Sequence, residues 1–199
     1  EIYDKNKENE MIEKFEINRI KEKYQDNPYL CQLYPNTCGM FYSINQSNEL
    51  KKLYEKENNF TYDIVIRCRP DFEYYTLLNE EVLNLVKENN ILMPLDNYAF
   101  VTQQCDKFAI GSSKIMDYYC DLITLMLDYE NKYPKEFWDG PSVLKKHLEE
   151  GNIKTNWIYF DYEYHIRRKS QRLTEDKRLK LDYDRKNLLI TKPKKYNKV

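Results

Sequence analysis

The stretch TYDIVIRCRPDFEYY, residues 61–75, joins a run of β-branched residues to a cluster of charged ones. Ile64, Val65 and Ile66 are consecutive apolar residues. Apolar residues that follow one another without alternation are typical of a strand buried on both faces. The stretch therefore predicts a central strand of a sheet, running parallel to its neighbours.

The segments around this strand alternate between helix and strand patterns. Apolar residues at near-helical spacing predict an amphipathic helix in residues 1–24, whereas two prolines and a glycine predict a loop at 26–40. Further helices are predicted at 41–59, 79–90, 114–133 and 140–150, and further strands at 91–95, 106–111 and 153–168. This order predicts an α/β domain with a mostly parallel central sheet flanked by helices. We expect one domain, residues 1–190, followed by a flexible basic tail, residues 191–199.

The composition predicts a globular, well-solvated protein. The hydrophobic fraction is 41% and the charged fraction 33%, and the formal net charge is -1. A chain without net positive charge has no global field favouring nucleic acid, so only a weak contact through the basic C-terminal end would remain. No apolar run approaches the roughly 20 residues that a transmembrane helix needs. We therefore expect no nucleic-acid partner and no transmembrane segment.

The five cysteines are odd in number and include no C-x-x-C pair. This pattern indicates neither a zinc site nor a complete disulfide framework. Reduced thiols predict an intracellular, cytoplasmic protein, in the host cytoplasm if the chain is viral, with a single Cys31–Cys38 bridge as the alternative. The chain opens at Glu1 rather than Met, so an upstream targeting segment is compatible with this prediction.

Four charged residues follow the predicted central strand: Arg67, Arg69, Asp71 and Glu73. Alternation along an extended chain places all four on one side, provided that Pro70 preserves the register. Guanidinium groups suit phosphate, and paired carboxylates suit a hard cation such as Mg²⁺ or Mn²⁺. The pattern predicts a metal-bridged diphosphate site, and an internal network of ion pairs is the alternative.

Three segments in order resemble a known family: a Y-D-x-V-I-R-x-R-P-D motif at Tyr62–Asp71, D-x-F-A-I-G-S-S-x-x-M at Asp106–Met116, and a late YEYHIRR. The chain from about Met40 to Arg168 resembles GT-A-type glycosyltransferases, among them the WavE-type lipopolysaccharide-synthesis proteins and related sugar transferases of algae and large DNA viruses. The resemblance implies a GT-A-like, Rossmann-like fold. It also implies transfer of a sugar from a nucleotide-sugar, such as a UDP- or GDP-sugar, to a glycan or protein acceptor.

The resemblance also implies a metal site. Asp71 and Glu73, as D-x-E, occupy the place of the family's D-x-D motif after a central strand. A late histidine completes the metal shell in many GT-A enzymes, and His165 is the candidate here, with a packed core histidine as the alternative. The other histidine, His147, is expected on the surface of its helix.

The remaining site residues would bind phosphate or activate the acceptor. Arg67, Arg69 and Arg167 are the expected phosphate contacts. A carboxylate near the acceptor hydroxyl would act as general base; Asp139, beside Trp138, is the first candidate and Asp106 the second. A helix cap or turn is the structural alternative for Asp139.

GT-A domains begin with a nucleotide-binding βαβ unit, whereas this chain begins with a charged helix. Either the first donor-binding strand lies upstream of Glu1, or the domain is a reduced one. In the second case the alternative function is a non-catalytic domain of the same fold that binds a glycan or a protein partner.

Overall fold

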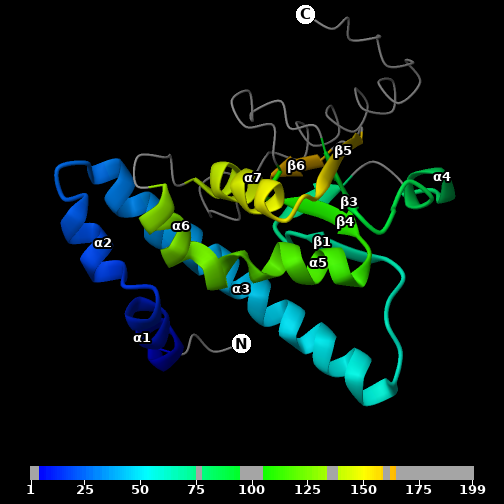
Figure 1. Ribbon diagram of the computed structural model, residues 1–199, viewed down its shortest axis with the longest axis horizontal. Helices are drawn as coiled ribbons and strands as arrows, with labels where there is room; N and C mark the ends of the chain where they lie inside the picture. Colours follow the sequence, from blue (N-terminus) through cyan, green and yellow to red (C-terminus); the bar gives the residue numbers. More distant parts are fainter. Residues whose placement is uncertain (1–4, 75–77, 95–104, 134–138, 159–161, 165–199) are drawn as a thin grey trace, which may run out of the picture.

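The computed structural model describes residues 5–74, 78–94, 105–133, 139–158 and 162–164. Figure 1 shows a mixed sheet with helices packed beside it. The elements are, in chain order, α1 (Lys5–Lys14), α2 (Ile17–Lys23), α3 (Pro28–Asn58), β1 (Val65–Cys68), β2 (Phe72–Tyr74), α4 (Glu80–Leu83), β3 (Asn90–Pro94), β4 (Phe108–Gly111), α5 (Ser113–Cys120), the 3-10 helix η1 (Asp121–Leu125), α6 (Met126–Lys132), α7 (Gly140–Glu150), β5 (Lys154–Ile158) and β6 (Tyr162–Tyr164).

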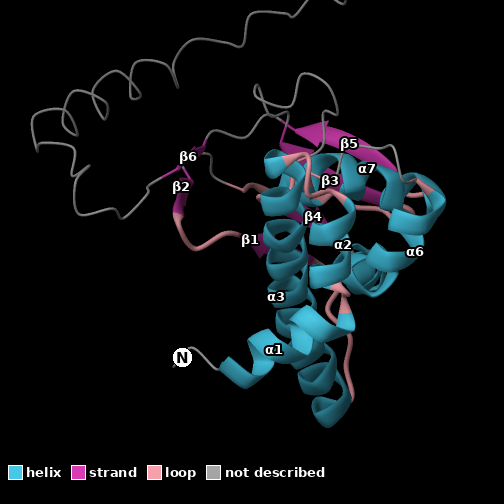
Figure 2. Cartoon of the chain, turned by 90° about the vertical axis from the view of Figure 1, so that its left-hand side faces the viewer, coloured by secondary structure: helices cyan, strands magenta, loops and turns pink. Residues whose placement is uncertain are grey.

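The main sheet has the strand order β1-β4-β3-β5. β4 pairs antiparallel with both β1 and β3, and only β3 and β5 run parallel. The prediction of a mostly parallel, GT-A-like central sheet is therefore wrong. β2 and β6 form a separate antiparallel pair, set apart from the main sheet in Figure 2.

β1 lies at an edge of the sheet among the described strands, not at its centre. Its residues alternate between half-buried and exposed, and Ile66 is 43% exposed. The central positions belong to β3 and β4, where every residue is buried. The run Ile64–Val65–Ile66 predicted a central strand, but only Val65 packs against the main core.

The two faces of the sheet carry different cores. Ile91 and Met93 of β3 and Ala109 of β4 pack with the helices in the main core. On the opposite face, Leu92, Phe108, Ile110 and Ile158 form a smaller core, which Tyr74, Leu78, Val82 and Val86 cover in part. This alternation along each strand places Val65 and Arg67 of β1 on the helical side of the sheet.

Residues 28–40 are helical, so the loop predicted at 26–40 is wrong. Asn27 caps α3 by accepting a hydrogen bond from the N–H of Leu30, and Pro28 occupies the first turn, where no donor is required. Pro35 lies inside the helix, which costs about 3 kcal/mol. Tyr34 and Phe41 are each at most 1% exposed. Burial of each such side chain stabilises the fold by roughly 1.5–3 kcal/mol, which offsets the cost of the proline.

The N-terminal amphipathic segment forms two helices instead of one. Glu16 adopts a left-handed conformation, with φ 48°, between α1 and α2. Phe15, Ile17 and Ile20 are nevertheless buried, as the spacing predicts. The predicted helix at 114–133 is likewise divided into α5, η1 and α6.

His147 is fully buried, so its predicted surface position is wrong. Its ring stacks on Tyr118, with centroids 4.2 Å apart, and its Nδ1 lies 3.0 Å from the hydroxyl of Tyr129. Its Nε2 donates to the main-chain oxygen of Tyr118 at 2.6 Å. These contacts join α7 to α5 and α6.

Candidate functional site

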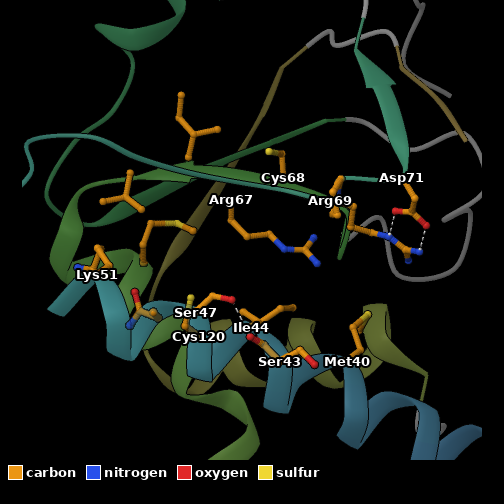
Figure 3. A pocket seen from close by; sticks show the side chains of 15 residues that line it. Met40, Ser43, Ile44, Ser47, Lys51, Arg67, Cys68, Arg69, Asp71 and Cys120 are labelled. Carbon is orange, nitrogen blue, oxygen red and sulfur yellow. Dashed lines mark hydrogen bonds and ion pairs between the residues drawn. The ribbon is translucent and has the colours of Figure 1, made fainter. Parts of the chain in front are cut away.

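A groove of about 850 Å³ runs between β1 and α3 (Figure 3). One wall is the segment from Val65 to Asp71, and Met116 and Cys120 of α5 close its base. The other wall is one face of α3, whose residues recur at helical spacing: Met40, Ser43, Ile44, Ser47, Asn48 and Lys51. The end of the predicted strand therefore does border a groove, although the strand lies at the edge of the sheet.

Arg67 extends from β1 toward α3 (Figure 3). Its Nη1 donates a hydrogen bond to the main-chain oxygen of Asp106, which fixes the guanidinium at the groove. None of the ion pairs between described residues involves Arg67. Arg67 therefore forms no direct ion pair with a described carboxylate, although its charge favours the ionised forms of Asp71 and Asp106.

Arg69 is held against Asp71 in a two-point ion pair (Figure 3). Its Nε lies 2.9 Å from Oδ1 of Asp71, and its Nη2 lies 2.7 Å from Oδ2. The pair forms because the chain turns at Pro70 and Asp71 before β2 begins. The hydrogen bonds from Arg69 lower the pKa of Asp71, and the guanidinium also lies 5.2 Å from the ring centroid of Phe72.

The expected metal ligands are not brought together in the described part of the chain. Both oxygens of Asp71 accept from Arg69, and the described residues contain no group of three acidic, histidine or cysteine side chains able to hold a metal ion. Glu73 lies in β2, opposite Glu163 of β6, but its side chain is outside the described set, and so is His165. The described contacts of Asp71 are those of an ion pair, and the metal site predicted at Asp71, Glu73 and His165 stays a prediction.

Lys51 closes the far end of the groove as part of a charge network that the sequence analysis missed. Its Nζ lies 3.0 Å from Oε2 of Glu55 and 2.9 Å from Oδ1 of Asp117. Burial opposes ionisation of Glu55, but hydrogen bonds from Tyr62, Ser113 and Lys51 outweigh it and lower the pKa. The i, i+4 spacing of Lys51 and Glu55 was the available signal. Lys51 thus has two carboxylate partners already.

The two expected catalytic carboxylates lie near the start of α7 and do not line the groove. Asp139 caps α7, because its Oδ1 accepts from the N–H of Ser142 at 2.6 Å. Asp106 is 9% exposed, its Oδ1 has no partner among the described residues, and burial raises its pKa. A Cβ on Gly140 would lie 2.7 Å from Oδ2 of Asp106, so Asp106 packs directly against the first turn of α7.

The remaining site predictions divide between described and undescribed residues. Arg167 and Trp138 are outside the described residues, so their predicted roles stay predictions.

All five cysteines are free thiols, including Cys31 and Cys38. Burial raises the pKa of Cys120, at the base of the groove, to about 12, so this thiol is protonated at neutral pH.

Comparisons with family models, with curated proteins and with solved structures found no match to this chain. The resemblance to glycosyltransferases therefore remains a prediction from the sequence motifs. Among the described helices, none has the length and apolar character required to cross a membrane.

Proposed function

We propose that the chain transfers a sugar from a nucleotide-sugar donor to a glycan or protein acceptor, and that the donor's diphosphate binds at Arg67 and Arg69. The observation that carries the proposal is the guanidinium of Arg67, held at the groove without a described carboxylate partner. An arginine fixed in this way is preorganised for an anion, because the charge and the fork geometry match phosphate oxygens.

The size and lining of the groove agree with this ligand class. Its volume of about 850 Å³ falls in the range of pockets that hold nucleotide-sized ligands. Ile44, Val65 and Met116 supply apolar surface for a base or sugar ring, while Ser43 and Ser47 supply hydroxyl groups. One basic end and a mixed apolar and polar body suit a nucleotide-sugar.

A second candidate function is a non-catalytic domain that binds a glycan or a protein partner through the same groove. The positions of Asp106 and Asp139 favour it, since the first is buried behind the groove and the second caps a helix. Neither carboxylate lines the groove from which an acceptor hydroxyl would approach.

Donor turnover separates the two candidates. The protein is incubated with a panel of UDP-, GDP-, dTDP- and ADP-sugars together with a mixture of glycan and peptide acceptors. The nucleoside diphosphate released when the sugar passes to an acceptor or to water is measured, and direct binding of each diphosphate is measured by calorimetry. If the chain is a transferase, we expect it to bind the nucleoside diphosphate and to release it from the donor. Arg67→Gln should abolish this release. Lys21→Gln, which changes an exposed lysine of α2, should leave both binding and release unchanged. Binding without release would favour the non-catalytic domain, and absence of binding at millimolar nucleotide would refute the donor site.

A further inference from the structure

We propose that the outer edge of β1, formed by the main chain of Ile66 and Cys68, is a docking site for an extended, acidic peptide segment of another protein. The segment would pair with β1 as an additional antiparallel strand. The proposal goes beyond the nucleotide-sugar site, and it specifies the protein partner that the second candidate function leaves open.

The main-chain groups of Ile66 and Cys68 point away from β4. The two strands pair antiparallel, and the N–H of Arg69 donates to the main-chain oxygen of Lys107 at 3.2 Å. Hydrogen-bonded and non-hydrogen-bonded pairs alternate along such a ladder, so Arg67 also bonds to β4. The N–H and C=O groups of Ile66 and Cys68 then face the opposite edge, which no described strand covers. An added strand pairs with groups of this kind.

The groove reaches this outer edge. Successive side chains of a strand alternate between its two faces, and Figure 3 shows Arg67 and Cys68 on opposite sides of β1. Every residue from Val65 to Asp71 nevertheless lines the groove. Consecutive residues share one cavity where their main chain borders it, so the outer edge of β1 is open to the groove.

The groove has room for a strand beside β1. One extended residue in a packed sheet occupies roughly 160 Å³, from a rise of about 3.3 Å, a strand spacing of about 4.8 Å and a layer about 10 Å thick. The groove volume of about 850 Å³ therefore corresponds to about five extended residues. Because β1 spans Val65–Cys68, a segment of this length pairs with the whole strand. Pairs at Ile66 and Cys68 supply up to about four main-chain hydrogen bonds.

Arg67 determines the charge of the partner. It is the charged residue of β1, it extends toward α3, and it forms no ion pair with a described carboxylate. A charge on an edge strand opposes pairing with strands that do not neutralise it. The residue opposite Arg67 would stand in a non-hydrogen-bonded pair, where side chains approach each other most closely. We therefore expect an aspartate or a glutamate at that position.

Apolar surface determines the flanking positions. Val65 of β1, Ile44 of α3 and Met116 of α5 all line the groove. On the other face of β1, Ile66 is 43% exposed. Cross-strand pairs between β-branched residues are favourable at such positions. The expected ligand is therefore an extended segment in which β-branched residues flank an acidic one.

The test is binding of a set of fluorescein-labelled peptides to the full chain, measured by fluorescence anisotropy. Each capped peptide of about seven residues carries glutamate or aspartate at its centre and valine, isoleucine or threonine on both sides. One form is N-methylated on the two neighbours of the acidic residue, and a second form on the acidic residue itself. In the antiparallel register the N–H groups of the neighbours donate to β1, whereas that of the acidic residue points away.

The first methylation should weaken binding at least about 10-fold and the second less than about threefold. Equal effects of the two methylations, or effects in the reverse order, would overturn the proposal. Absence of binding by the whole set at millimolar peptide would do the same. This comparison needs no change to the protein.

Two positions of the protein test the main chain and the charge separately. Cys68→Pro removes an outward N–H at an exposed edge position, where proline is tolerated. It should weaken binding at least about 10-fold relative to Cys68→Val, which keeps that N–H. Arg67→Gln and replacement of the peptide's acidic residue by its amide should each weaken binding about 5- to 20-fold, and the two together no further. Additive losses would show that the two side chains do not meet and would overturn the register. Lys21→Gln is the surface control, and thermal unfolding shows whether each variant is folded.

The outcomes separate this proposal from the donor site. Peptide binding by a chain that binds no nucleoside diphosphate would support the proposal and refute the donor site. Diphosphate binding without peptide binding would overturn the proposal and leave the donor site standing. Competition between the two ligands would support a shared site at Arg67. Sedimentation tests the remaining occupant, because a wild-type dimer that Cys68→Pro dissociates would assign the edge to a second copy of the chain and overturn the peptide partner.

Discussion

Acidification from pH 7.5 to pH 5.5 should destabilise the fold through His147. The ring is fully buried, and its Nε2–H donates to the main-chain oxygen of Tyr118. In this tautomer Nδ1 accepts the hydrogen bond from Tyr129. Burial lowers the pKa of His147 from 6.5 to about 4, because a proton on Nδ1 would place a positive charge among aromatic rings.

The sign and size of the effect follow from proton linkage. The folded pKa lies below the unfolded one, so the unfolded state binds more protons as the pH falls. The contribution of His147 to stability is fully present above about pH 6.5 and is lost progressively down to about pH 4. With pKa values of 6.5 and about 4, the loss between pH 7.5 and 5.5 is about 1.3 kcal/mol. That corresponds to roughly 3–5 °C in melting temperature for a chain of this length.

Urea unfolding followed by far-UV circular dichroism at the two pH values measures this loss. The comparison is between wild type and His147→Gln, which keeps a donor for Tyr118 and cannot titrate in this range. Burial raises the pKa of Asp106, so that carboxyl changes stability in the opposite direction, but its contribution is common to both proteins and cancels. The reasoning is refuted if wild type and His147→Gln lose the same free energy of unfolding, within about 0.3 kcal/mol.

Three further substitutions test the packing around the site, all by urea unfolding. Gly140→Ala should destabilise the protein by about 1–3 kcal/mol, because its Cβ would lie 2.7 Å from a buried carboxylate oxygen. In Gly39→Ala the nearest atom to the new Cβ would be 3.9 Å away, so this substitution should leave stability unchanged or raise it. Equal losses of stability in Gly140→Ala and Gly39→Ala would contradict the steric explanation. Asp139→Ala should lower the free energy of unfolding by about 0.5–2 kcal/mol, because it removes the side-chain cap of α7. Asp139→Ser keeps a capping oxygen and should lower it much less. Similar losses in the two variants would show that the cap is not the cause. Glu130→Gln should lower the free energy of unfolding by about 1–2 kcal/mol, since it weakens the contact with Lys23 that joins α2 to α6. An unchanged urea midpoint would show that this contact does not stabilise the protein.

The sequence predicted strands at the positions of β3 and β4, but neither their central place in the sheet nor their direction. β3 and β4 lie close to the segments predicted as strands, 91–95 and 106–111. Direction depends on which strands pair, and the burial pattern of a single strand carries no such information. The run at Ile64–Ile66 was misleading, because Ile66 is apolar and yet faces outward at the edge of the sheet.

Helix α3 and His147 show a second limit of sequence patterns. Pro28, Pro35 and Gly39 each favour a loop locally, but Tyr34, Cys38 and Phe41 share one helical face and are buried together. Tertiary packing outweighs the local preference. His147 follows two lysines on an amphipathic helix, and nothing nearby in the sequence shows that the aromatic partners of its ring come from α5 and α6.

The charged motif after β1 had two interpretations, a ligand site and an internal network of ion pairs, and the structure treats its two arginines differently. Arg69 fits the network, since its Nε and Nη2 contact both carboxylate oxygens of Asp71, two residues further along the chain. Arg67 does not, because its described hydrogen bond goes to a main-chain oxygen, and a neutral acceptor offsets little of the cost of drawing a guanidinium partly out of water. A half-buried cation held at a groove by one main-chain oxygen, that of Asp106, would gain stability from an anion in that groove. The network interpretation therefore accounts for the Arg69–Asp71 half of the motif, and an anionic ligand at Arg67 stays a proposal.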